Sequence, residues 1–152
     1  QNPDLIGKDA ISEQRRFGNQ LHEVLSLTLD VKNLDEIVRD LILKGKLEIQ
    51  FEDKIKEDAR KILTHPAYIQ LFEGTTEILR EQDIILSENE SKRPDLILVK
   101  PNETIILDYK TGKEETKYAK QLRLYCSTLS DMGFPKVSGL ILYTSSLKLV
   151  TC

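Results

Sequence analysis

Two aspartates and a lysine on successive strand-like segments are the residues best suited to chemistry. Asp95 opens one apolar segment, and Asp108-Tyr109-Lys110 closes the next one, with twelve residues between the two aspartates. Side chains two apart on a strand point the same way, so Asp108 and Lys110 share a face and Tyr109 points to the other. If the two strands pair antiparallel, the carboxylate of Asp95 falls beside that of Asp108.

Two adjacent carboxylates favour a cation between them, because their charges otherwise repel. Oxygen ligands of this kind suit a hard divalent ion such as Mg²⁺ or Mn²⁺. The alternative is structural, since Pro94-Asp95 is typical of a turn and an Asp-x-Lys on a strand is typical of an exposed, ion-paired edge. The location of both motifs on apolar strands favours the metal site.

Three further motifs could contribute to such a site. Gly18 and His22 lie one helical turn apart, and the small residue would let another element approach the imidazole, although a surface histidine is the alternative. Gln121 and Tyr125 share a helix face that could be directed towards the metal site or towards a nucleic-acid strand. The alternative is a polar helix face with a half-buried tyrosine. Glu81 could be an additional acid or surface charge on a strand.

The net charge of −3 is not that of a typical nucleic-acid-binding protein, but the local charge differs from the average. Between positions 110 and 123, five basic residues stand against Glu114 and Glu115, a surplus of three positive charges. The five are Lys110, Lys113, Lys117, Lys120 and Arg123. A solvated helix face is the alternative interpretation of this segment.

Hydrophobic periodicity predicts a helical first half and a second half of strands around one helix. Helices are expected over 11–29 (with Ser12 as N-cap), 34–43, 52–63, 67–72 and 116–129. Strands are expected over 76–86, 95–99, 104–110, 137–143 and 147–150. The strand–helix–strand unit starting at 104 predicts a right-handed crossover between parallel strands, and short connections predict antiparallel pairing before it. The predicted fold class is therefore α/β, with a mixed central β-sheet flanked by helices.

Length and composition indicate one soluble domain. We expect residues 1–152 to form it, with a mainly helical part at 1–74 and a strand-rich part at 75–152. No apolar run approaches the roughly 18–20 residues of a membrane span, and no signal peptide is visible. Cys126 and Cys152 indicate neither a disulfide framework nor a zinc site. We therefore expect a cytoplasmic protein with no membrane partner, and the missing initial Met predicts a piece of a longer chain.

The motifs together resemble the RecB-like nucleases of the PD-(D/E)xK superfamily, the C-terminal nuclease domains of UvrD/Rep-type helicases. That family has Gly-x3-His on an early helix, Glu, Asp and Asp-x-Lys on three strands, and Gln-x3-Tyr on the next helix. The matching residues, in the family's order and within about 17–143, are Gly18, His22, Glu81, Asp95, Asp108-Tyr109-Lys110-Thr111-Gly112, Gln121 and Tyr125. Leu96 departs from the family, since many relatives carry Arg there, so the contact that this Arg makes with DNA or with another site residue is not expected here.

The resemblance implies a restriction-endonuclease-like core with an N-terminal helical segment, and it implies roles for the motif residues. His22, Asp95, Asp108 and the backbone carbonyl of Tyr109 would hold one or two Mg²⁺ or Mn²⁺ ions, which would activate a water and offset charge on the phosphate. Lys110 would orient that water or stabilise the transition-state anion. The cysteine quartet of the iron–sulfur branch is absent, so no cluster is expected.

The remaining motif residues would contact substrate or support catalysis. Gln121 and Tyr125 would position the scissile strand, and Glu81 would be an additional catalytic acid. Flanking phosphates would be bound by Lys113, Lys117, Lys120 and Arg123.

The function implied is hydrolysis of DNA phosphodiesters by an exonuclease, acting on single strands or ends alongside a helicase in recombination and repair. One alternative is a nucleic-acid-binding or docking module on the same fold that has lost its chemistry. The other is a structural α/β domain with a coincidental motif, which predicts no divalent-ion affinity and an ion-paired Asp108–Lys110 edge.

Overall fold

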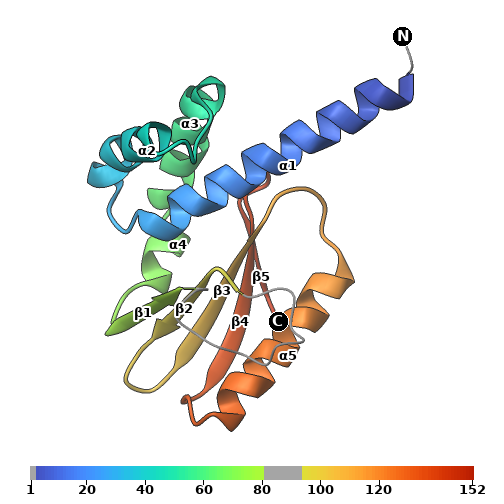
Figure 1. The fold of residues 1–152 in the computed structure, drawn as a ribbon. Coiled ribbons are helices and arrows are strands. Elements are labelled where there is room, and N and C mark those ends of the chain that lie inside the picture. Colours follow the sequence, from blue (N-terminus) through green and yellow to red (C-terminus); the bar gives the residue numbers. More distant parts are fainter. Residues whose placement is uncertain (1–2, 81–93) are drawn as a thin grey trace. The chain divides into compact units, whose positions relative to one another are not determined.

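The computed structural model describes residues 3–80 and 94–152, which fall into two compact units, 1–68 and 69–152 (Figure 1). The first unit is helical and the second carries the sheet.

The N-terminal unit is built from helices joined by short connections. They are α1 (Pro3–Leu27), α2 (Leu34–Leu43), α3 (Glu52–Leu63) and the start of α4 (Pro66–Leu71), with single 3-10 turns at Val31–Asn33 and Ile49–Phe51. Its buried core comes from the apolar stripes of these helices, as their spacing predicts. The buried side chains of this core include Leu21, Val24, Leu25, Leu34, Val38, Leu41, Phe51, Ile55, Ile62 and Tyr68.

The predicted bounds of α2 and α3 agree with the structure, but those of α1 do not. The helix begins at Pro3, so Ser12 lies inside it, and the prediction that Ser12 is the N-cap is wrong. The Ser12 hydroxyl instead accepts a hydrogen bond from Arg16 one turn later, at 3.2 Å. The early turns were missed because residues 3–10 lack a regular apolar stripe, although Pro3 suits the first turn of a helix.

The second unit is a five-stranded mixed sheet with one helix against it (Figure 1). Its elements are β1 (Glu77–Arg80), β2 (Leu96–Val99), β3 (Thr104–Lys110), α5 (Thr116–Asp131), β4 (Val137–Tyr143) and β5 (Lys148–Thr151). The strand order is β1-β2-β3-β4-β5, and every neighbouring pair is antiparallel except β3 with β4. The predicted α/β class, mixed sheet and parallel β3–α5–β4 connection are confirmed. Residues 81–86 of the first predicted strand lie outside the described residues.

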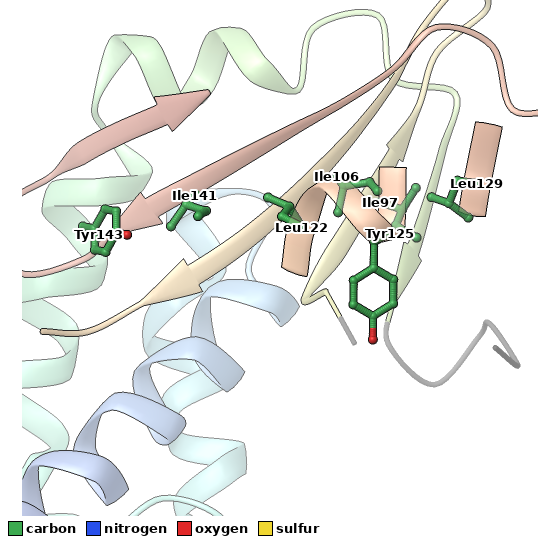
Figure 2. Packing of buried hydrophobic residues seen from close by; sticks show 7 residues of the cluster. All are labelled: Ile97, Ile106, Leu122, Tyr125, Leu129, Ile141 and Tyr143. Atoms are coloured by element: carbon green, nitrogen blue, oxygen red, sulfur yellow. The ribbon is translucent and has the colours of Figure 1, made fainter. Parts of the chain in front are cut away.

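The core of this unit lies between α5 and one face of the sheet (Figure 2). Ile97, Ile106 and Ile141 come from three neighbouring strands, and Leu122 and Leu129 come from the helix. All are at most 3% exposed. This packing fixes α5 across the strands and therefore fixes the position of the side chains on its first turns relative to the end of β3.

Gly139 on β4 allows α5 to approach the sheet closely. A Cβ atom added there would lie 2.9 Å from Cγ and Cδ2 of Leu122 and 3.1 Å from Sγ of Cys126. Those side chains are held between helix and sheet, so a larger residue at 139 must displace the Leu122 side chain or the helix itself.

Replacing Gly139 with Val should therefore lower the free energy of unfolding by about 1–3 kcal/mol, as overpacked cores do. Urea denaturation followed by circular dichroism measures the change. Ser138→Val is the matched control, since Ser138 is the exposed neighbour on the same strand, and it should change stability by no more than about 0.5 kcal/mol. Equal stability of the Gly139→Val variant and the parent would show that α5 does not depend on this close approach.

Among the helices within residues 3–80 and 94–152, none combines the length and apolar character that crossing a membrane requires.

Candidate active site

The register of β2 and β3 brings the two predicted acids face to face. Leu96 pairs with Leu107 in the antiparallel ladder, so the next position along places Asp95 opposite Asp108. Directly opposed residues on antiparallel strands have their Cβ atoms about 4.5–5.5 Å apart. The two carboxyl groups therefore meet at the end of the sheet where β2 begins and β3 is about to end.

Asp95 is held in place by the backbone of β3. The backbone N–H of Tyr109 donates a hydrogen bond to Oδ2 of Asp95 at 2.8 Å. Tyr109 lies beyond the last ladder pair with β2, so the Asp95 side chain replaces the missing strand partner of that N–H.

The electrostatics of Asp95 show the cost of this arrangement. Burial raises its pKa to about 8, and the charge of Asp108 and a hydrogen bond with that carboxyl act in the same direction. The Tyr109 N–H and the charge of Lys110 lower the pKa but do not offset these effects. Without a bound cation, the pair therefore holds a proton at neutral pH.

Lys110 stands beside the acid pair. Its Nζ lies 3.1 Å from Oδ2 of Asp108 and 4.8 Å from the ring centroid of Tyr118, which is on α5. The carbonyl of Lys110 accepts hydrogen bonds from the backbone N–H and the hydroxyl of Thr144, at 2.8 and 3.2 Å. These bonds fix the backbone from which the lysine side chain projects.

An ion pair between Asp108 and Lys110 is also what a purely structural strand edge would show. That interpretation leaves Asp95 unexplained, because a buried carboxyl group opposite a second one is destabilising unless its charge is offset.

A small pocket opens between these residues and the first half of α5. It is lined by Pro94, Asp108, Lys110, Tyr118, Gln121, Leu122 and Tyr125. Gln121 is exposed, whereas Tyr125 is buried within the core cluster that Figure 2 shows. The structure thus brings the Gln-x3-Tyr helix face to the Asp-x-Lys strand end.

The residues at this strand end suit a hard divalent cation. Asp95 and Asp108 offer carboxylate oxygens, and a cation between them would relieve the repulsion that raises the pKa of Asp95. No group of three or more His, Cys, Asp or Glu residues that could hold a metal occurs within the described ranges 3–80 and 94–152. Two carboxylates with water and phosphate oxygens are nevertheless an ordinary ligand set for Mg²⁺.

The described structure does not test the place of two predicted site residues at this strand end. His22 is half-buried and Gly18 is buried on α1, which belongs to the N-terminal unit. Glu81 lies outside the described residues. Their parts in the site remain predictions.

The predicted phosphate-binding residues lie on α5 and on the connection before it. Lys113, Lys120 and Arg123 are exposed. Lys117 is exposed too, with its Nζ 3.1 Å from Glu115 and 5.3 Å from the ring centroid of Tyr118. Surface ion pairs of this kind are weak, so the Glu115 partner leaves Lys117 available to a phosphate.

Tyr118 is the residue of this pocket that the sequence motifs missed. A signal was present, because Tyr118, Gln121 and Tyr125 are spaced i, i+3, i+7 and share one helix face.

The chain was compared with known proteins. A search of curated proteins found no match. The family model described as the PD-(D/E)XK nuclease superfamily matches residues 4–148, a range that covers most of each unit of the structure and includes all of the motifs above. The facing aspartates, the adjacent lysine and this match agree: the chain belongs to the PD-(D/E)XK nuclease superfamily.

Proposed function

We propose that this domain is a divalent-metal-dependent deoxyribonuclease that hydrolyses phosphodiester bonds. The observation that carries the proposal is the pair of facing carboxyl groups, Asp95 and Asp108, with Lys110 beside them. Membership of a nuclease superfamily supports the same reaction class.

Each residue at the strand end has a task in this reaction. A bound divalent ion would supply an activated water and offset the charge that develops on the phosphate. Asp95 and Asp108, with the carbonyl oxygen of Tyr109, would hold that ion, and His22 and Glu81 are proposed to add to the site. The Tyr109 N–H keeps the Asp95 carboxylate oriented. The Lys110 ammonium stabilises negative charge on the phosphate in the transition state.

The pocket on α5 suggests how a strand is positioned. Gln121 and Tyr125 line it beside Asp108 and Lys110, so a nucleotide at the strand end would contact them. The exposed cations of this segment would bind flanking phosphates, a contact that positions the strand without reading its sequence. These cations are Lys113, Lys117, Lys120 and Arg123.

We also propose membership of the RecB-like branch, with exonuclease action on single strands or ends and an associated UvrD/Rep-type helicase in cytoplasmic DNA recombination or repair. The support is the order of the motifs, from Gly18 and His22 to Gln121 and Tyr125. In this proposal the motor delivers the strand to the site.

A binding or docking module on the same fold is the competing function, and Lys110→Ala separates the two. We expect the variant to cleave single-stranded DNA about 10²–10³-fold more slowly than the parent, because one preorganised charge at the reacting phosphate contributes about that much. Cleavage of linear and circular strands is measured with Mg²⁺, with Mn²⁺ and with EDTA. If the linear strand is degraded and the circular strand is not, the enzyme is an exonuclease.

Lys61→Ala is the control, since Lys61 is an exposed lysine on α3 that is paired with Glu57 and has no role in the proposed reaction, and it should cleave at the parental rate. No cleavage by the parent with either metal, and no metal-induced rise in Tm, would favour the docking module.

A further inference from the structure

Tyr118 contacts the lysine of the site and lies outside the Gln-x3-Tyr pattern. Its ring centroid is 4.8 Å from Nζ of Lys110, within the range of a cation–π interaction. The half-buried side chain lines the same pocket as Asp108 and Lys110, from the first turn of α5.

The two partners of the Lys110 ammonium differ in what happens to them when a cation binds. Under the proposed function, on which this inference rests, Asp108 is also a ligand of the divalent ion. A carboxylate that shares its charge with such an ion attracts an ammonium group less strongly, because the ion opposes the lysine. The Tyr118 ring keeps its attraction, since hard cations take oxygen ligands and do not compete for an aromatic face.

A lysine that loses its carboxylate partner has little else to hold it, because its charge sits on a flexible four-carbon stem. We infer that Tyr118 is a positioning residue whose ring face holds the Lys110 ammonium at the end of β3 while Asp108 is engaged with the metal. The ammonium then stays preorganised for the phosphate, and no binding energy is spent on ordering it.

Two other roles of the ring have to be separated from this one. Tyr118 packs partly against the core cluster, and Nζ of Lys117 lies 5.3 Å from the same ring. Tyr118→Phe keeps both the packing and the aromatic face. Tyr118→Leu keeps apolar packing but removes the face. Lys117→Ala removes the second cation.

The test uses proton NMR of Lys110 in the full chain, with and without Mg²⁺, with the signals assigned from the Lys110→Ala protein. The ring should shift the methylene protons next to Nζ of Lys110 upfield, and the shift should persist when Mg²⁺ is added. Tyr118→Phe and Lys117→Ala should keep it, and Tyr118→Leu should lose it. Metal-dependent DNA cleavage should be about tenfold slower in Tyr118→Leu and within about threefold of the parent in Tyr118→Phe.

Two results would overturn the inference. One is an upfield shift in the parent that disappears when Mg²⁺ is added, and the other is a Tyr118→Leu protein that cleaves DNA at the parental rate. A parent that cleaves no DNA but keeps the shift with Mg²⁺ would overturn the nuclease proposal alone, and the contact between Tyr118 and Lys110 would stand.

Discussion

Asp108→Asn is expected to lower the rate of DNA cleavage by about 10³-fold or more. The substitution removes one of the two charges that offset a divalent ion, and metal activation supplies several kcal/mol of transition-state stabilisation. The side chain keeps its size, so the sheet should be preserved. The measurement is single-turnover cleavage of end-labelled single-stranded DNA in Mn²⁺.

The stability of the Asp108→Asn protein should stay close to that of the parent. The change removes the charge that disfavours ionisation of Asp95, and it also removes the ion pair with Lys110; these two losses affect stability in opposite directions. We expect Tm to move by less than about 5 °C. Asp131→Asn, at the exposed end of α5, is the control and should retain full cleavage. Parental cleavage by Asp108→Asn would remove Asp108 from the site.

Metal binding and stability should both depend on pH through Asp95. Its pKa in the folded protein is raised from 3.8 to about 8, so the metal-free fold is stabilised by the bound proton at low pH. That contribution to stability is fully present below about pH 4, and it is lost as the pH rises through about 8. A metal must displace the same proton, so its apparent affinity should rise up to about tenfold per pH unit towards pH 8 and then level off.

Tm of the metal-free protein should therefore fall as the pH rises from 5 to 9. Added Mg²⁺ should raise Tm more at the higher pH values than at the lower ones. Asp95→Asn is the informative variant, because its side-chain oxygen can still accept the hydrogen bond from the Tyr109 N–H but cannot titrate. This variant should lose the pH dependence that Asp95 causes, whereas Asp131→Asn should keep it. An unchanged slope in Asp95→Asn would assign the pH dependence to another group.

The sheet could be predicted from the sequence because its strands are short apolar runs with clear ends. β3 and β4 have their predicted bounds, since β-branched and apolar residues fill each run and turn residues flank it. The pairing of Asp95 with Asp108 followed from the two-residue period of a strand and the short connection between β2 and β3. Local rules therefore sufficed for the centre of the site.

Features that depend on tertiary packing could not be predicted in the same way. The contact of Tyr118 with Lys110 requires the chain to turn at Gly112, whose φ of +92° the sequence does not specify. The close approach of α5 at Gly139 depends on how helix and sheet pack. The start of α1 at Pro3 has no apolar stripe to mark it.

The central claim is that Asp95 and Asp108 together hold a divalent cation, and direct titration with Mn²⁺ tests it. Electron paramagnetic resonance measures free Mn²⁺ as protein is added, with the parent, Asp95→Asn, Asp108→Asn and Asp131→Asn compared at pH 8. We predict that the parent and Asp131→Asn bind at least one ion and that each of the other two variants loses most of the affinity. Equal Mn²⁺ binding by all four proteins, or none by the parent, would contradict the account.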